Sequence, residues 1–548
     1  MSSHRVSSRP PRAAGRSAAI GTDPELIARY LDDAAHFPGG HAAGVALPAS
    51  EGEVAELVRA SHHVLAVGAQ SSLTGGATPN GGLVLATSRL DRLDLDAGDV
   101  IRVGAGVPLV ALQAALRASE RFYPPVPTHD GACVGGVTAT NAAGPTTFKY
   151  GSTRDWVTGV TAVLASGEVL DLRRGDARAH PDGYFEIEES GRRYRVPVPG
   201  YRMPEVAKCS AGYFAAPGMD LVDLFVGSEG TLGIVTEVAL RVLPRLPVIC
   251  SFFVTTTSER VGLDLAARLR SASLETRASN SPDGIDVSAI EHMDRRCLEL
   301  AREDGADRHC QISVPPDSEL ALWIQLELPA PLTTAEGYDQ IGGALSPGQP
   351  ATPLVRACRM FDELGLLDRM EVAMPEETTR QAQLRRFREA VPTAVNQRVG
   401  AAKQTIDPRI QKIAADMVVP FHRMPEMLSA YREGFERRGL DCATWGHLSD
   451  GNVHPNVIPR SLADVDAGKA AVLEFGRRVV SLGGCPLAEH GVGRNPVKQA
   501  LLAQLYGSRG IEAMRRVKRA LDPDGKLAPG VLFPATDREA RRHDVRRR

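Results

Sequence analysis

Apolar residues recur along the chain with two different periods, and segments of the two kinds alternate from about residue 48 onward. Short, nearly continuous or alternating apolar runs between Gly-rich turns predict strands at 64–67, 82–87, 100–103, 160–172, 221–242, 249–255 and 322–328. Apolar residues three and four positions apart predict amphipathic helices at 51–61, 109–119, 260–270, 378–391, 424–437 and 464–482. Such alternation is typical of α/β and α+β domains, and we expect an α+β fold.

The character of the sequence changes after Pro244, where longer amphipathic helices begin to alternate with strands. We expect one domain over 40–244 and a second α+β domain over 245–535. Residues 173–220 are polar and rich in Pro and Gly, which predicts a long excursion from the first domain. A disordered tail is expected over 1–22 and a basic tail over 536–548. The first 20 residues contain no acid, as in organellar transit peptides, but Arg and Ala are abundant throughout the chain.

Composition excludes several classes of protein. The 548 residues are 43% hydrophobic and carry a formal net charge of -2, so nothing favours a nucleic-acid partner. The chain has no apolar run of the length of a transmembrane helix and no secretory signal. Eight scattered cysteines without CxxC spacing suit a reducing compartment. We expect a cytoplasmic protein, with peripheral membrane association and a homodimer both left open.

The segment 446–455 places His447 and His454 on either side of Asp450-Gly451. Asp-Gly predicts a two-residue hairpin loop, in which His447 would face His454 across the two strands. Two opposed imidazoles could bind one cation, and Glu489-His490 would add ligands suited to zinc or a similar metal. The alternative is that the two histidines only pack the hairpin.

Three segments are unusually rich in small residues: 68–77, 124–145 and 226–236. Glycine allows backbone N–H groups to approach a ligand closely, and a run of such groups can bind a pyrophosphate. Neither a Walker loop nor a G-x-G-x-x-G fingerprint is present. A single loop of this kind is weak evidence, but three in one domain indicate a long, flat ligand held by backbone.

These motifs resemble the FAD-binding domain of the vanillyl-alcohol oxidase and p-cresol methylhydroxylase (PCMH) superfamily. Within it, the chain is similar to the family of D-lactate dehydrogenase, the glycolate oxidase large subunit and D-2-hydroxyglutarate dehydrogenase. The resemblance is carried in order by 68–77, Gly135-Gly136 with 140–142, 149–151, 227–234, 446–455 and 489–493. It implies a PCMH-type FAD-binding domain, an α+β substrate domain and a C-terminal helical segment that returns to the flavin.

The resemblance also implies bound FAD. No histidine occupies the loop 68–77, a frequent site of covalent attachment, so noncovalent FAD is expected and His129 is the alternative attachment point. The cofactor-binding residues that it implies are Gly68, Ala69, Gln70, Ser71, Ser72, Leu73, Thr74, Gly75, Gly76, Ala132, Gly135, Gly136, Thr138, Asn141, Ala142, Gly144, Gly151, Glu229, Gly233, Ile234 and Val235.

The family's reaction is oxidation of a D-2-hydroxy acid, such as lactate, glycolate or 2-hydroxyglutarate, to the 2-oxo acid, with hydride passing to FAD. The resemblance assigns Arg388 and Lys403 to the substrate, although on sequence alone both could lie on solvated helix faces. It assigns His447, His454 and Glu489 to a divalent metal, zinc or manganese, that polarises the hydroxyl. His490 is the expected base.

Three positions depart from the family pattern. Val67 replaces a usual Arg or Lys before the loop, Ser72 replaces a frequent Gly, and Ala528 replaces a usual Asn near the flavin. Two other enzymatic functions stay open: alkyl transfer as in alkylglycerone-phosphate synthase, and a metal-independent oxidase that uses oxygen. A non-enzymatic flavin-binding subunit is a further alternative, and the presence of Arg388, His447 and Glu489 counts against it. The electron acceptor is a quinone, a flavoprotein, a cytochrome or oxygen.

Overall fold

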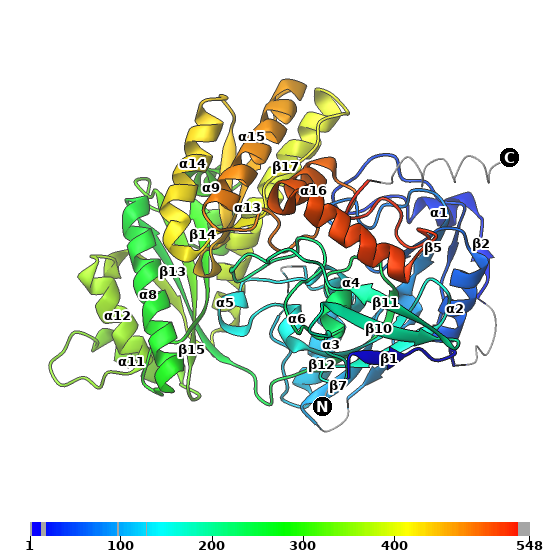
Figure 1. Ribbon diagram of the computed structural model, residues 1–548. Helices are drawn as coiled ribbons and strands as arrows, with labels where there is room; N and C mark the ends of the chain where they lie inside the picture. Colours follow the sequence, from blue (N-terminus) through cyan, green and yellow to red (C-terminus); the bar gives the residue numbers. More distant parts are fainter. Residues whose placement is uncertain (1–2, 13–17, 96–97, 126, 128, 535–548) are drawn as a thin grey trace. The chain divides into compact units, whose positions relative to one another are not determined.

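A computed structural model describes residues 3–12, 18–95, 98–125, 127, 129–534. The chain divides into two compact units (Figure 1). The described parts of 1–144, 151–245 and 485–534 form the first unit, and Pro145–Tyr150 with Leu246–Gly484 form the second. Each unit combines sheets with helices, which confirms the α+β fold class.

The first unit contains a small sheet in the order β2-β3-β5-β4, in which β3, β5 and β4 are parallel. Its elements are β2 (Ile20–Gly21), α1 (Pro24–Ala28), β3 (Gly44–Ala46), α2 (Glu51–Ala60), β4 (Val64–Val67), β5 (Leu83–Ala86) and the 3₁₀ turn η1 (Thr87–Arg89). Helix α2 begins where the Ser50 side chain accepts a hydrogen bond from Glu53 N–H, and it buries Val54, Leu57 and Val58.

A second sheet of the first unit is antiparallel, in the order β6-β7-β12-β8-β9. Its strands are β6 (Leu93–Asp94), β7 (Val100–Gly104), β8 (Val157–Val163), β9 (Val169–Arg173) and β12 (Ile234–Arg241). Helix α4 packs on β12. The helices of this part are α3 (Leu109–Arg117), α4 (Val134–Thr140), α6 (Thr153–Trp156) and α7 (Val222–Phe225).

The third sheet corrects the expectation of a disordered N-terminal tail. Residues 173–220 contain a hairpin of β10 (Tyr184–Glu189) and β11 (Arg192–Pro197), and β1 (Arg5–Ser7) pairs with β10 in parallel. The expected disordered tail over 1–22 is therefore wrong for the described residues 3–12, whose backbone hydrogen bonds are supplied by a strand far along the chain. Residues 1–2, 13–17 and the expected basic tail 536–548 lie outside the described residues. Helix α16 (Pro496–Leu521), bent at Gly507, packs beside β11.

The second unit is built on one antiparallel sheet in the order β16-β13-β15-β14-β19-β20-β17, with β18 also paired to β20. Its central strand β14 is buried along nearly its whole length, as expected where both faces of a sheet are covered. The strands are β13 (Val248–Thr256), β14 (Val287–Asp294), β15 (Leu320–Leu328), β16 (Met370–Ala373), β17 (Ile413–Ala414), β18 (Met417–Val418), β19 (Cys442–His447) and β20 (Asn452–Val457).

Helices α8 and α13 pack on this sheet. The helices and 3₁₀ turns of the unit are α5 (Thr147–Tyr150), α8 (Glu259–Ser279), α9 (Arg295–Glu303), α10 (Ala306–Cys310), α11 (Thr334–Gly342), α12 (Pro353–Glu363), η2 (Leu367–Arg369), α13 (Thr378–Thr405), η3 (Phe421–Arg423), α14 (Met424–Glu436), η4 (Leu448–Asp450) and α15 (Leu462–Ser481).

Helix α13 is longer than the predicted helix 378–391. Pro392 lacks an N–H group and ordinarily breaks a helix, yet the structure continues through it to Thr405. Val391, Ala394 and Val395 on either side of the proline are buried, so packing compensates for the lost hydrogen bond. The prediction ended the helix too early because it weighed the local signal alone.

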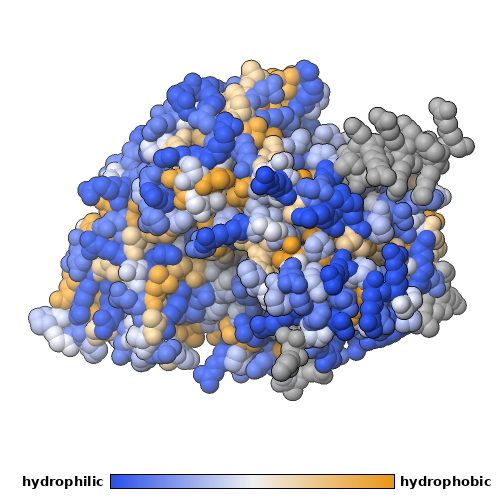
Figure 2. Space-filling model, in the orientation of Figure 1, coloured by the Kyte–Doolittle hydropathy of each residue, from blue (hydrophilic) through white to orange (hydrophobic). Residues whose placement is uncertain are grey.

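The face seen in Figure 2 is covered mostly by hydrophilic residues, with hydrophobic ones in small, scattered groups. Among the helices of the described ranges, none combines the length and the hydropathy needed to cross a bilayer.

Candidate active site

The loop 68–77 connects β4 to β5 and is shaped by its own small residues. The Ser72 hydroxyl accepts hydrogen bonds from the N–H groups of Thr74 (3.2 Å) and Gly76 (3.1 Å), which closes a tight turn. Gly75 has φ +75°, and a Cβ atom there would lie 2.6 Å from the Phe37 ring. Ser72, which departs from the family's usual glycine, therefore supports the loop by a different means.

Helix α4 carries two adjacent glycines with different surroundings. A Cβ atom at Gly135 would lie 2.7 Å from the Cβ and 2.9 Å from the carbonyl oxygen of Ala105, so the helix approaches β7 closely there. A Cβ atom at Gly136 would meet nothing within 4 Å. Gly135 is thus required for packing, whereas Gly136 leaves open space in the wall of a cavity.

Glu229 connects the third glycine-rich segment to 491–493. Its two carboxylate oxygens accept hydrogen bonds from the N–H groups of Val492 and Gly493, each at 2.8 Å. Burial raises the pKa of Glu229 to about 7, although these two N–H groups stabilise the charged form.

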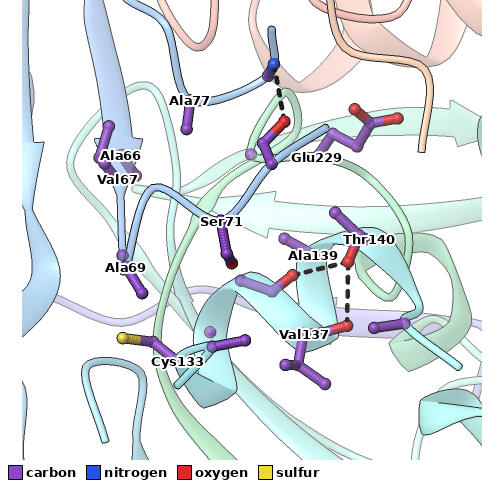
Figure 3. Close-up of a pocket in the computed structure, with 18 of the residues that line it drawn as sticks. Ala66, Val67, Ala69, Ser71, Ala77, Cys133, Val137, Ala139, Thr140 and Glu229 are labelled. Carbon is purple, nitrogen blue, oxygen red and sulfur yellow. Dashed lines mark hydrogen bonds between the residues drawn. The ribbon is translucent and has the colours of Figure 1, made fainter. Parts of the chain in front are cut away.

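These segments line one cavity within the first unit (Figure 3). Ala69 and Ser71 come from the loop, and Ala139 and Thr140 come from α4. The predicted cofactor residues that line it are Gly68, Ala69, Gln70, Ser71, Ser72, Leu73, Gly76, Ala132, Gly135, Gly136, Ala142, Glu229, Gly233, Ile234 and Val235. Glu489, His490 and His129 also line it. The expected base therefore shares a wall with the segments expected to hold FAD.

The remaining predicted cofactor residues are not among those that line this cavity. Thr138 is fully buried and its carbonyl accepts a hydrogen bond from Gly227 N–H, while the Asn141 side chain accepts one from Arg154 N–H. The Thr74 carbonyl accepts hydrogen bonds from the N–H groups of residues 494 and 495. Gly75, Gly144 and Gly151 complete the group, and Gly151 has φ +76°.

The sequence-based prediction missed several lining residues. Most are small or apolar residues without a recognisable motif: Ala66, Val67, Ala77, Thr87, Ala105, Pro127, Cys133, Val137, Ala139, Thr140, Ala143 and Gly230. Ala66, Val67, Thr87 and Ala105 lie outside the three glycine-rich segments 68–77, 124–145 and 226–236. Only the folding of the chain brings such residues to one cavity.

Lys208 is a further residue near the site that the sequence-based prediction missed. Its side chain is fully buried in the first unit, and its Nζ lies 3.0 Å from Glu489 Oε2. Glu489 Oε1 in turn lies 3.5 Å from His490 Nε2. Lys208 belongs to the polar segment 173–220, which was expected to be a long excursion from the first domain.

In the second unit, Glu291 joins two of the predicted site residues. Its Oε1 lies 2.5 Å from His447 Nδ1, and its Oε2 lies 2.7 Å from Arg388 Nη2 and Nε. Burial alone would raise the pKa of Glu291, but His447 and Arg388 outweigh it and hold that pKa well below its usual range. Arg388 is buried in this cluster, so the alternative of a solvated helix face is wrong for it.

The hairpin differs from its predicted register. The strands pair His447 with Asn452 and Trp445 with His454, and the connection is the four-residue segment 448–451 with a 3₁₀ turn. The predicted two-residue loop is therefore wrong. The shift is two residues, so the histidines stay on the same face, and their ring centroids lie 5.4 Å apart.

His454 has a carboxylate neighbour, whereas Lys403 has none of the predicted surroundings. His454 Nδ1 lies 3.6 Å from Asp416 Oδ1, and both residues are buried in the second unit. Lys403 is exposed in the last turn of α13 and does not precede a strand directly.

Ala528 has an unusual backbone. Its φ is +44°, and its N–H donates to the Val64 carbonyl. Asparagine tolerates this left-handed region better than alanine does, which gives a backbone reason for the asparagine that is usual in the family.

Comparisons with known proteins agree with this geometry. Residues 42–173 match the family model described as FAD binding domain, and residues 268–532 match the C-terminal domain of FAD linked oxidases. The chain is 28% identical over 530 residues to D-2-hydroxyglutarate dehydrogenase of Xanthomonas citri pv. viticola, covering 94% of each protein. It is 25% identical over 499 residues to D-lactate dehydrogenase of Archaeoglobus fulgidus, covering 89% of this chain and 90% of the relative.

Among solved structures, 4-ethylphenol oxidase from Gulosibacter chungangensis shares the fold with a TM-score of 0.62. The two sequences are 17% identical, and the match covers 95% of each chain.

Proposed function

We propose that this chain, which belongs to the FAD-linked oxidases, oxidises a small D-2-hydroxy acid to the 2-oxo acid. The family membership makes the chain an FAD-linked oxidoreductase. The choice of substrate class is supported by two relatives named for D-lactate and D-2-hydroxyglutarate. The observation that supports the proposal most is that His490 and Glu489 line the same cavity as the three glycine-rich segments.

The residues around the cavity fit FAD. Gly136 and Gly230 leave open space where other residues would carry a side chain, so a flat ligand can approach the backbone. Bound FAD supplies the acceptor for the two electrons and the hydrogen that leave the substrate carbon. Because the loop 68–77 contains no histidine, we propose that FAD is bound noncovalently.

We assign the substrate carboxylate to Arg388. Glu291 binds the edge formed by Nε and Nη2, which fixes the guanidinium plane and directs Nη1 to another partner. Lys403 is exposed, so we assign it the weaker task of attracting the anionic substrate.

We assign a divalent metal, zinc or manganese, to His447, His454 and Glu489. Glu291 engages His447 Nδ1, which leaves Nε2 as the coordinating nitrogen, an arrangement typical of metal-binding histidines. Asp416 beside His454 offers a further oxygen ligand. The metal would lower the pKa of the substrate hydroxyl.

We assign the general base to His490, which accepts the proton of that hydroxyl. His490→Gln should retain the yellow cofactor and lower kcat by about 100- to 10,000-fold. His62→Gln, an exposed histidine of the same unit, is the control and should keep full activity. A His490→Gln enzyme with normal turnover would remove this residue from the mechanism.

The substrate class is tested by anaerobic addition of D- and L-2-hydroxy acids to the purified yellow protein. A D-acid should bleach the flavin absorbance, and its L-enantiomer should not. If no hydroxy acid bleaches the flavin while an acyl dihydroxyacetone phosphate does, the proposal is wrong and alkyl transfer replaces it. Rapid reoxidation of the bleached enzyme by air would identify oxygen as the acceptor, whereas slow reoxidation would point to a quinone, a flavoprotein or a cytochrome.

The metal is tested separately. Dialysis against a chelator should abolish bleaching without releasing FAD, and zinc or manganese should restore it. Bleaching that is indifferent to the chelator would support the metal-independent oxidase in place of the metal-assisted reaction.

A further inference from the structure

Two cysteines that take no part in the proposed reaction lie together in the first unit. The sulfur atoms of Cys209 and Cys485 are 3.5 Å apart, although the residues are 276 positions apart in the sequence. A disulfide bond is about 2.0 Å long, so the sulfurs need to approach by only about 1.5 Å. All eight cysteines are present as free thiols in the structure.

The backbone around the two thiols is already joined. Ser210 N–H donates to the Leu487 carbonyl at 3.0 Å, and Gly491 N–H donates to the Ser210 hydroxyl at 3.0 Å. The Cys485 thiol also lies 3.2 Å from the Leu487 carbonyl. The two chain segments are thus held together by hydrogen bonds directly after the two cysteines.

The two thiols differ in accessibility. Cys485 is fully buried, whereas Cys209 is partly exposed. The hydrogen bond between Cys485 and Cys209 also lowers the pKa of the Cys209 thiol. The partly exposed thiol is the one that an oxidant can reach, and its buried neighbour can then resolve the product.

We propose that Cys209 and Cys485 form a redox-active dithiol that hydrogen peroxide converts to a disulfide. The Cys209 sulfur attacks one peroxide oxygen, the O–O bond breaks, and Cys209 becomes a sulfenic acid as one water leaves. The Cys485 sulfur then attacks the Cys209 sulfur, the S–O bond breaks, and a second water leaves. Two thiols and one peroxide thus give one disulfide and two waters, and a dithiol reductant reverses the change.

A disulfide between Cys209 and Cys485 would lie close in the sequence to the contact between Lys208 and Glu489. Lys208 precedes Cys209 and contacts Glu489, which follows Cys485 by four residues. A disulfide would therefore join covalently the two segments that carry these cavity-side residues. Because the cross-link closes a long loop of chain, the oxidised protein should also unfold at a higher temperature than the reduced protein.

The test uses the full-length holoprotein, fully reduced and then desalted. After mild peroxide treatment under native conditions, free thiols are alkylated and peptides are analysed by mass spectrometry. We expect the number of alkylated thiols to fall from eight to six, with one cross-linked peptide pair that contains Cys209 and Cys485. Dithiothreitol should restore all eight.

Cysteine-to-serine variants separate formation of the sulfenic acid from formation of the disulfide. Cys485→Ser should leave a sulfenic acid on Cys209 that dimedone traps, and Cys209→Ser should prevent both products. Cys442→Ser removes another partly exposed cysteine and should leave the cross-link unchanged. The proposal is wrong if native protein keeps eight alkylatable thiols after peroxide, if Cys209 pairs with another cysteine, or if Cys209 proceeds to sulfinic acid with Cys485 still free. The wild-type result decides the question even if a variant fails to fold.

Discussion

Glu291 is the residue on which the polar centre of the second unit depends. It is fully buried on β14 and binds His447 through one carboxylate oxygen and Arg388 through the other. A carboxylate in such a place is stable because two partners compensate for its lost hydration. The same contacts orient both predicted site residues, so Glu291 is a positioning residue.

Glu291→Gln should lower the free energy of unfolding by about 3 kcal/mol, because it leaves a buried guanidinium without its counter-charge. Urea unfolding followed by tryptophan fluorescence measures this change, since Trp323 and Trp445 lie in the same unit. Glu319→Gln removes one partner of the exposed pair with Arg295 and should cost less than about 1 kcal/mol. Equal losses in the two variants would refute the structural importance of Glu291.

Glu229 should make the first unit less stable as pH rises. Its pKa is raised from 4.5 to about 7, so the folded state favours the protonated form. That stabilisation is fully present below pH 4.5 and is lost as pH rises through 7. The carboxylate lines a cavity and is partly exposed, so we expect a loss of about 2 kcal/mol or less between these limits.

Urea midpoints of FAD-free protein between pH 5 and pH 8 measure this effect. Glu229→Gln cannot ionise and should show a flatter profile. Glu237, in β12 of the same unit, forms an ion pair with Arg102 near the surface. The control variant Glu237→Gln should keep the wild-type dependence of the urea midpoint on pH. A wild-type profile without a decline in this range would contradict the raised pKa.

At the scale of elements, α4 shows how a short helix can serve packing and binding at once. Gly135 allows contact with the backbone at Ala105, and Gly136, one position later, opens to the cavity. Successive residues of a helix point about 100° apart, so adjacent glycines face different neighbours. The two glycines therefore have separable roles.

Gly136→Val should leave the FAD-free fold intact and weaken FAD binding at least about tenfold, a loss of about 1.4 kcal/mol. Gly135→Ala should instead lower the thermal stability of the FAD-free protein, because the new Cβ atom collides with backbone. Flavin content and calorimetry distinguish the two results. Gly400→Ala, in open space within α13, is the matched control and should stabilise by up to about 1 kcal/mol.

For the whole molecule, FAD should be a structural ligand as well as a reactant. Three segments far apart in the sequence line the cavity that we propose for FAD, and a ligand bound by all three would oppose their separation. Free FAD at about 100 times its Kd should raise the free energy of unfolding by about 2.7 kcal/mol.

Thermal scans of FAD-free protein at increasing FAD concentration check this expectation. The unfolding temperature should rise with the concentration of FAD. It should not change when free adenosine diphosphate is added at low concentration. Gly136→Val should need more FAD for the same shift. A transition that does not respond to FAD would place the cofactor outside this cavity.

Several elements could be predicted because their signals are local. The periodicity of apolar residues located α2, β4 and the four longest helices of the second unit, α8, α13, α14 and α15, but not its shorter ones. The glycine-rich loop 68–77 was found by its composition alone. The course of α13 through Pro392 and the register of the hairpin at 442–457 could not be found in this way. In both cases packing against other elements outweighed a local preference: that of Pro392 to end a helix, and that of Asp450-Gly451 to form a two-residue loop.

The sequence by itself determined the α+β class, the family and three segments that line the cavity proposed for the flavin, because these depend on periodicity and on motifs of consecutive residues. Only the tertiary structure decided which partners those residues have. Glu291 beside Arg388 and His447, Lys208 beside Glu489, and Cys209 beside Cys485 are each pairs of residues 97 to 281 positions apart. No local pattern encodes such distances, because burial of a charge or a thiol against its partner is decided by the packing of the whole unit.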